Sequence, residues 1–285
     1  MVQVPSLHPA RLHGLAAALA LLVSSALPLQ AQTRAALLGN QQQGLVGAEL
    51  RPGWITENGT RMAALHLRLA DGWKTYWRIP GEAGIVPRID FSGSQNLAEA
   101  RLHWPRPVVF HQAGLRSIGY QGELVLPIEL TPRHAGRPIA LQAEINIGIC
   151  DEVCVPVDLN LSAALRGAGS EDRLIARSLA STARPAGPAG LRDARCSAEP
   201  GQRGTELTLR ATLPEQGRGE HLILEIPGSG YWISDRDSWR EGDELIGRAR
   251  IRAPGGGTVS IDRSAVAFTV LGSNRMLEHR GCTGG

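Results

Sequence analysis

The strongest constraint on the fold is a pair of alternating apolar segments on either side of two closely spaced cysteines. Apolar residues occupy every second position in both segments, namely Ile139, Leu141, Ala143, Ile145, Ile147 and Ile149, then Val155, Val157, Leu159 and Leu161. Alternation of period two is typical of β-strands with one buried face, because successive side chains point to opposite sides of a sheet. The segments therefore predict two neighbouring strands, with Cys150 and Cys154 at the connection between them.

The rest of the chain also favours short strands joined by turns. Its 285 residues include 34 glycines and 18 prolines, which interrupt regular structure and mark turns. Apolar or alternating segments predict further strands at 64–69, 123–130, 207–213, 222–226 and 266–270. The chain is therefore expected to be all-β.

Residues 101–123 are expected to form a long ordered loop instead. Pro105 and Pro107 each remove a backbone donor that a central strand would need.

A break in the strand pattern follows residue 165. Ser170 is expected to cap a short helix, with Glu171 and Asp172 in its first turn. The sequence "ARPAGPAG" then reads as a linker. The predicted organisation is a signal peptide (1–31), an N-terminal β-sandwich (32–165), a short helix and Pro/Gly linker (166–190) and a second, smaller β-domain (191–285).

The N-terminus indicates export. Arg11 precedes an uncharged run from Gly14 to Leu29, and Leu29-Gln30-Ala31 fits a small-residue cleavage site. The apolar run is short for a membrane span, and no later segment is apolar enough to be one. We therefore expect a periplasmic protein, in a compartment where disulfides persist.

The charge pattern argues against two classes of partner. The formal net charge is +3 and no block of basic residues occurs. Neither nucleic acid nor an anionic membrane surface is therefore expected as a partner.

The four cysteines allow three pairings. Cys150 with Cys154 and Cys196 with Cys282 is the simplest, because each bond then stays within one predicted domain. Loop-closure entropy gives about 4 to 5 kcal/mol for the long loop and only about 2 kcal/mol for the short one. The 196–282 bond is therefore predicted to be structural.

The short pair admits three interpretations: a structural staple, a metal clip or a redox couple. Strained or exposed disulfides tend to be the reactive ones, but the spacing alone does not decide. Two thiolates could hold Cu(I), whereas zinc prefers four ligands. The nearest histidines show no paired spacing, and they are His103, His111 and His134. No metal or cofactor is predicted, and no hydrolase motif is recognised.

Four stretches carry a family resemblance. They are "GWKTYWRIPGEAG" (72–84), "WPRPVVF" (104–110), "GYQGELVLPIEL" (119–130) and "ICDEVCVPVDLNL" (149–161). In this order they resemble the periplasmic N-terminal domain of the DsbD/ScsB thiol–disulfide interchange proteins. The similarity is greatest to the ScsB-like branch, which is associated with suppression of copper sensitivity, and the second β-domain also resembles the continuation found in that branch.

The resemblance implies an immunoglobulin-like β-sandwich in which Cys150 and Cys154 are the redox couple. It also implies a cap loop with a shielding aromatic residue, for which Phe110 and Tyr120 are the candidates. Trp73, Tyr76 and Trp77 are expected in the core, with a partner-binding groove as the alternative.

Two features of the sequence depart from the full family pattern. The sequence contains no polytopic membrane domain and no thioredoxin-like domain, and the cysteine spacing is shorter than in the classical DsbD branch. A separate membrane protein is therefore expected as the electron donor, with thioredoxin-like periplasmic proteins as partners.

The resulting prediction is an electron relay, a thiol–disulfide oxidoreductase if the pair is redox-active. Cys154 is expected to attack and Cys150 to resolve. Asp151 and Glu152 would disfavour thiolate formation, unless they simply face solvent. The alternatives are a non-catalytic binding module with two structural disulfides and a Cu(I)-handling protein.

Overall fold

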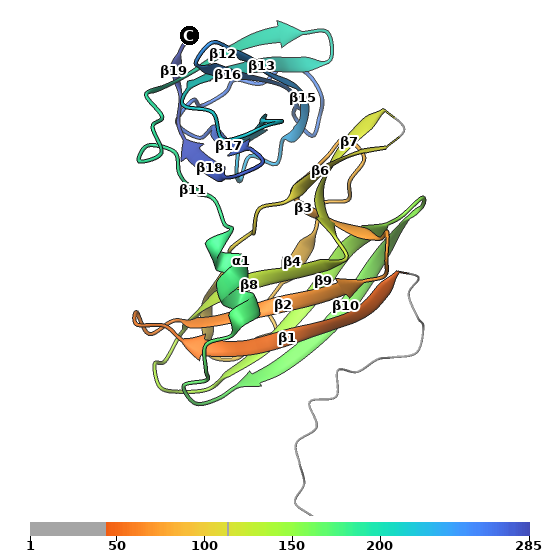
Figure 1. The fold of residues 1–285 in the computed structure, drawn as a ribbon, viewed down its shortest axis with the longest axis vertical. Coiled ribbons are helices and arrows are strands. Elements are labelled where there is room, and N and C mark those ends of the chain that lie inside the picture. The colour runs from red at the N-terminus through yellow and green to blue at the C-terminus, as the bar shows by residue number, and fades with distance from the viewer. Residues whose placement is uncertain (1–43, 113) are drawn as a thin grey trace, which may run out of the picture. The chain divides into compact units, whose positions relative to one another are not determined.

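The computed structural model describes residues 44–112 and 114–285. The predicted signal peptide lies outside these residues. The described chain is almost entirely β-structure with one short helix (Figure 1). It has an all-β, immunoglobulin-like architecture with two groups of sheets, which confirms the expected fold class.

The first group consists of two sheets. One has the strand order β1-β2-β8-β5, and the other has the order β10-β9-β3-β7-β6 with β4 paired to β9. The strands are β1 (Leu45–Ile55), β2 (Arg61–Leu69), β3 (Lys74–Gly81), β4 (Arg88–Asp90), β5 (Leu97–Leu102), β6 (Val108–Gln112), β7 (Leu115–Gln121), β8 (Glu123–Pro132), β9 (Ile139–Cys150) and β10 (Cys154–Leu165). All pairings in these sheets are antiparallel.

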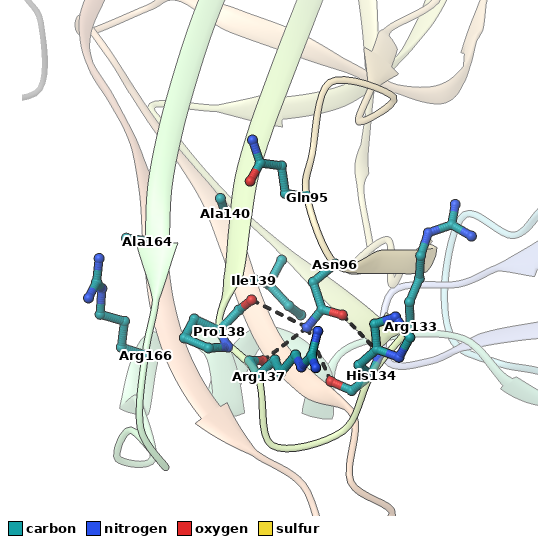
Figure 2. Close-up of a pocket in the computed structure, with 10 residues that line it drawn as sticks. All are labelled: Gln95, Asn96, Arg133, His134, Arg137, Pro138, Ile139, Ala140, Ala164 and Arg166. Carbon is teal, nitrogen blue, oxygen red and sulfur yellow. Dashed lines mark hydrogen bonds between the residues drawn. The ribbon is translucent and has the colours of Figure 1, made fainter.

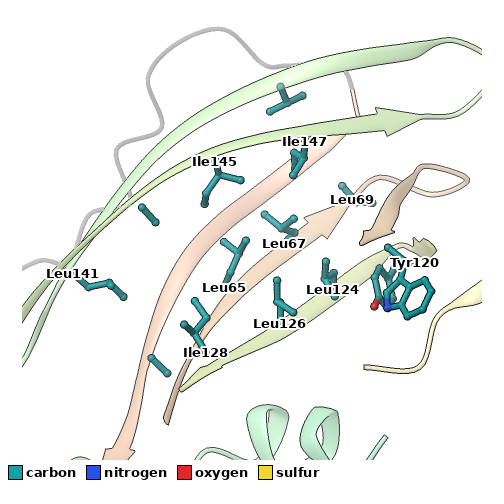
Figure 3. Packing of buried hydrophobic residues seen from close by; sticks show 14 of the residues in the cluster. Leu65, Leu67, Leu69, Tyr120, Leu124, Leu126, Ile128, Leu141, Ile145 and Ile147 are labelled. Carbon is teal, nitrogen blue, oxygen red and sulfur yellow. The ribbon is translucent and has the colours of Figure 1, made fainter. Parts of the chain in front are cut away.

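The core of this sandwich lies between its two sheets. Leu65 and Leu67 of β2 and Leu126 of β8 face Ile145 and Ile147 of β9 (Figure 3). On β9 the buried residues alternate with exposed ones from residue 139 to residue 145, as the sequence pattern predicts. This alternation fixes the register, since a slip of one residue would turn the isoleucines toward solvent.

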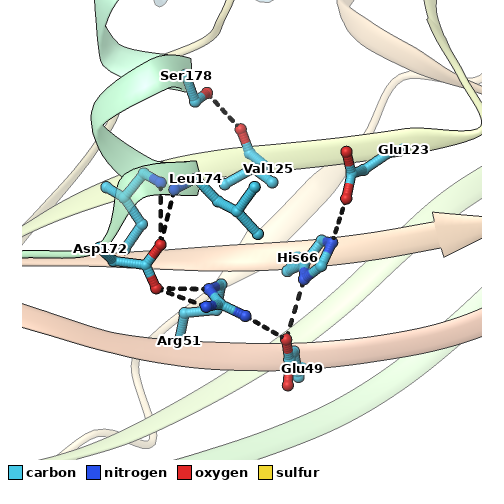
Figure 4. Close-up of polar contacts among 9 residues, drawn as sticks. Glu49, Arg51, His66, Glu123, Val125, Asp172, Leu174 and Ser178 are labelled. Carbon is cyan, nitrogen blue, oxygen red and sulfur yellow. Dashed lines mark hydrogen bonds and ion pairs between the residues drawn. The ribbon is translucent and has the colours of Figure 1, made fainter.

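The helix covers the outer face of the first sheet. Helix α1 (Arg173–Ala180) buries Ile175 against Met62 and Ala64 of β2, so that β2 is buried on both faces. Ser178 donates a hydrogen bond to the carbonyl oxygen of Val125 at 2.6 Å (Figure 4). One apolar stripe and one polar bond therefore attach the helix to the sandwich.

The second group also contains two sheets. Their orders are β11-β18-β17-β14 and β15-β16-β13-β12-β19. The strands are β11 (Arg184–Pro185), β12 (Asp193–Gly201), β13 (Gly204–Thr212), β14 (His221–Glu225), β15 (Trp232–Glu241), β16 (Glu244–Arg252), β17 (Ala267–Leu271), β18 (Met276–Arg280) and β19 (Thr283–Gly284). Leu207, Leu209, Leu224 and Phe268 form part of a separate core in this group.

Two local expectations are wrong. Residues 101–123 contain the β6–β7 hairpin rather than a long loop, because Pro105 and Pro107 lie before β6 and leave its ladder intact. The helix is capped by Asp172 rather than Ser170. The carboxylate of Asp172 accepts hydrogen bonds from the amides of Leu174 and Ile175, and Arg51 holds it in place.

Among residues 44–112 and 114–285, no helix has the length and apolar character needed to cross a membrane.

Candidate functional site

Cys150 and Cys154 form a disulfide where β9 passes into β10. Cys150 is the last residue of β9, Cys154 is the first of β10, and the two are directly paired in the antiparallel ladder. Their Cα atoms lie 4.1 Å apart. The disulfide therefore closes the end of the hairpin, at the strand connection predicted from the alternating segments.

The two cysteines differ in their access to solvent. Cys150 is only 1% exposed, whereas Cys154 lies on the exposed side of the turn. Val153 beside it is 71% exposed. Another protein could therefore contact the Cys154 residue, whereas Cys150 is covered.

Tyr76 contacts both sulfur atoms. Its hydroxyl oxygen lies 2.7 Å from Sγ of Cys150 and 3.1 Å from Sγ of Cys154. The side chain is 3% exposed, and burial raises the pKa of Tyr76 above its ordinary value. The hydroxyl therefore remains protonated at neutral pH and can donate a hydrogen bond to sulfur.

Strand pairing places Tyr76 at this point. β3 pairs with β9 at Lys74–Cys150 and Thr75–Ile149, and the hydroxyl of Thr75 donates to the carbonyl oxygen of Gly148 at 2.9 Å. Tyr76 is the next residue along β3. The backbone ladder thus carries the tyrosine to the cysteines from a position 74 residues away in sequence.

Two glycines allow the residues after β3 to pack closely around Tyr76. A Cβ atom at Gly84 would lie 2.3 Å from Cβ of Pro80 and 2.8 Å from the Tyr76 ring. A Cβ atom at Gly148 would lie 2.7 Å from Cβ of Ile85. Both contacts are shorter than side chains tolerate, so glycine is needed at each position.

The two candidate cap aromatics lie in different environments. Phe110 on β6 is half-buried, and Nζ of Lys74 lies 5.4 Å from the centre of its ring. Tyr120 on β7 is buried in the core and donates a hydrogen bond to the carbonyl oxygen of Pro105 at 2.8 Å. Burial raises the pKa of Tyr120 well above its usual value. Phe110 is therefore linked through Lys74 to the strand beside Cys150, while Tyr120 supports the hairpin from the core.

The carboxylates between the cysteines face outward. Asp151 and Glu152 are both exposed, and Oδ1 of Asp151 would lie 3.5 Å from a Cβ atom at Gly72. In the described part of the chain, no cluster of three or more His, Cys, Asp or Glu side chains is arranged to hold a metal ion.

The second disulfide joins Cys196 to Cys282, with Cα atoms 5.7 Å apart. Cys196 belongs to β12 and is 1% exposed, and its ladder partner Gly284 lies two residues after Cys282. The bond therefore connects β12 to the residue that precedes β19, across 86 residues of sequence. Both bonds have the pairing that the sequence favours.

The contact of Tyr76 with the disulfide is not predicted by the sequence, which places Tyr76 in the core with a partner-binding groove as the alternative. Tyr76 is buried, and its hydroxyl is directed to the disulfide. Only the pairing of β3 with β9 reveals this contact.

Comparison with known proteins identifies the first domain. Residues 30–165 match the family model described as "Thiol:disulfide interchange protein DsbD, N-terminal". The fold is similar to the N-terminal periplasmic domain of ScsB from Proteus mirabilis, with a TM-score of 0.61 and 24% sequence identity over 80% of this chain and 90% of that one. No curated protein matches the chain. Residues 30–165 are therefore similar in sequence to the DsbD N-terminal domain, and the described residues share the fold of the ScsB N-terminal domain.

Proposed function

We propose that this protein is a periplasmic electron relay in which Cys150 and Cys154 cycle between a dithiol and a disulfide. The observation that carries the proposal is the asymmetry of the pair. Cys154 is an exposed residue, Cys150 is buried, and the Tyr76 hydroxyl lies within hydrogen-bond distance of both sulfur atoms. A pair that acted only as a staple would not need one exposed cysteine.

The first step is attack by the reduced protein on a partner. The Cys154 thiolate attacks one sulfur of the partner's disulfide, forms a mixed disulfide and releases the partner's second sulfur as a thiolate, which takes up a proton. Cys154 is suited to this step because it is exposed, and Val153 offers an apolar contact beside it.

The second step resolves the mixed disulfide. The Cys150 thiolate attacks Sγ of Cys154, the intramolecular disulfide forms and the partner leaves with its second thiol. Two electrons have then passed to the partner. Cys150 is already within bonding distance of Cys154 in the hairpin, so resolution needs little movement.

Tyr76 assists whichever cysteine carries the thiolate. A charge-assisted hydrogen bond to a thiolate is stronger than one to a neutral sulfur. Because the hydroxyl lies near both sulfurs, it can stabilise either thiolate as the reaction proceeds. Phe110 is our candidate for the cap that shields the reduced pair from oxidation, and Tyr120 would support that cap from below.

We assign the redox reaction to a domain at residues 32–165. A short helix and linker occupy residues 166–190, and a second domain occupies residues 191–285. A membrane electron-donor protein would reduce Cys150–Cys154, and thioredoxin-like periplasmic proteins would receive the electrons.

Single-cysteine variants test the assignment of roles. In Cys150→Ser the attacking thiol remains and the resolving thiol is lost, so mixed disulfides with periplasmic thiol proteins should accumulate and disappear on reduction. In Cys154→Ser they should be nearly absent, because the remaining sulfur is buried. Equal trapping by both variants would contradict the assigned roles. No trapping by either would favour a binding module with two structural disulfides.

A further inference from the structure

A second site lies at the opposite end of β9 from the cysteines. A pocket of about 530 Å³ opens where β8 turns into β9 (Figure 2). Three of its lining residues are arginines, Arg133, Arg137 and Arg166, and His134 lies between the first two in sequence. None of the lining residues is an aspartate or a glutamate. Three cationic side chains therefore border the pocket, with Arg133 and Arg166 on opposite sides of it (Figure 2).

These three arginines differ from Arg51 of the same sandwich. Arg51 pairs with Glu49 and Asp172. By contrast, within residues 44–112 and 114–285 the guanidinium groups of the three pocket arginines make no hydrogen bond, ion pair or ring contact.

Asn96 holds the turn that carries this charge. Its side-chain amide donates to the carbonyl oxygens of Arg137 at 3.0 Å and His134 at 3.2 Å, and its side-chain oxygen accepts from the amide of His134 at 2.9 Å. Among the described residues, it is the one non-glycine residue with positive φ, at 59°. Such a conformation persists only where the surroundings impose it. The turn is thus fixed before any ligand arrives.

We propose that this pocket binds an oxyanion of the phosphate class. Guanidinium groups present planar pairs of donors that match phosphate oxygens, and several unpaired arginines favour a ligand with more than one negative charge. The ligand could be a free phosphate compound or the phosphate of an anionic lipid headgroup, since both offer the same oxygens. The proposal is independent of the redox function.

The pocket is well separated from the disulfide. Ile139 of the pocket and Cys150 are the two ends of the 12-residue strand β9, which spans roughly 36 Å when extended. An oxyanion in the pocket would therefore leave the cysteines open to a partner.

Isothermal titration calorimetry of the mature chain with inorganic pyrophosphate at low salt tests the proposal. We expect saturable binding that weakens with added salt. Arg137→Gln should weaken binding about fivefold, and the double variant Arg133→Gln/Arg137→Gln should abolish it. Arg184→Gln is the matched control, because Arg184 is exposed and lies on β11, outside the pocket.

A second arm identifies the source of the phosphate. Vesicles of phosphatidylcholine, with and without phosphatidylglycerol, are sedimented with the parent protein, Arg137→Gln, the double variant and Arg184→Gln. Arginine-dependent sedimentation with phosphatidylglycerol, without pyrophosphate binding, supports a lipid headgroup. The proposal is overturned if neither probe binds, if Arg184→Gln weakens binding as much as Arg137→Gln, or if only an acidic peptide binds. The reduction potential of Cys150–Cys154 should be the same in all four proteins.

Discussion

The hydroxyl oxygen of Tyr76 lies 2.7 Å from Sγ of Cys150, a buried sulfur on the neighbouring strand. The contact joins an ionisable group that stays protonated to a pair that would form a thiolate in the proposed relay. A hydrogen bond from this hydroxyl would favour that thiolate.

The Tyr76 hydroxyl is predicted to assist thiol exchange. Tyr76→Phe removes a hydrogen bond worth about 1.5 kcal/mol to a thiolate, so reaction of the reduced protein with a model disulfide should slow about tenfold. Stopped-flow measurement at pH 7 gives the rate. Tyr120→Phe is the matched control, since Tyr120 is also buried but donates to Pro105. That variant should lose stability and slow exchange less than Tyr76→Phe does, and equal slowing in both would remove the special role of Tyr76.

Lowering the pH should reduce the stability of the first β-sandwich, because Glu49 becomes protonated. A hydrogen bond from His66 at 3.0 Å, assisted by Arg51, holds the pKa of Glu49 below its ordinary value (Figure 4). The stability contributed by this carboxylate is present above its unfolded-state pKa and is lost as pH falls through the lower folded-state pKa. Because the Glu49 side chain is half exposed, solvent screening limits its contribution to the unfolding free energy to less than about 1 kcal/mol. Urea unfolding of Glu49→Gln from pH 7 to pH 3 should show a flatter pH dependence than the parent protein, and parallel curves would exclude this contribution.

The helix cap makes a separate prediction about stability. Asp172→Ala removes the acceptor for the first helical amides and the partner of Arg51, so unfolding free energy should fall by about 1 to 2 kcal/mol. Ser170→Ala should change it by less than about 0.5 kcal/mol, because Ser170 is exposed and precedes the cap. Urea denaturation compares the two. A larger loss for Ser170→Ala would restore Ser170 as the cap.

Asn96 allows the cost of its backbone conformation to be separated from that of its hydrogen bonds. Both Asn96→Gly and Asn96→Ala remove the side-chain bonds to the turn. Only the alanine variant also has an unfavourable backbone conformation at this positive φ, which lowers its unfolding free energy by about 1 to 2 kcal/mol. Thermal or urea unfolding should therefore rank asparagine above glycine and glycine above alanine. Equal stability of the two variants would mean that the turn relaxes to a different conformation.

Alternation in the sequence predicts much of the fold because it is a local property of each strand. The burial of β9 follows Ile139, Leu141, Ala143 and Ile145 as expected, and the cysteines lie at the predicted connection. The sequence does not predict the hairpin of β6 and β7, because Pro105 and Pro107 argue against a strand beside them. Both prolines lie before β6, where they remove no hydrogen bond from its ladder.

The site was predictable only in part. Two nearby cysteines and their pairing are visible in the sequence, but Tyr76 reaches them through the register of β3 on β9. The exposed position of Cys154 likewise depends on how the turn meets the sandwich. Such non-local relations have no signature in a single sequence. For the same reason, Arg166 could not be grouped with Arg133 and Arg137 before the fold was known.

The most direct test of the central claim is the reduction potential of Cys150–Cys154, measured by thiol trapping in glutathione and dithiothreitol buffers. Cys196–Cys282 is the internal control in the same molecule, since Cys196 is buried and its bond spans a sheet. The relay predicts that Cys150–Cys154 titrates reversibly in the folded protein while the second bond stays oxidised. If both bonds resist reduction until the protein unfolds, the pair is structural and the relay is contradicted.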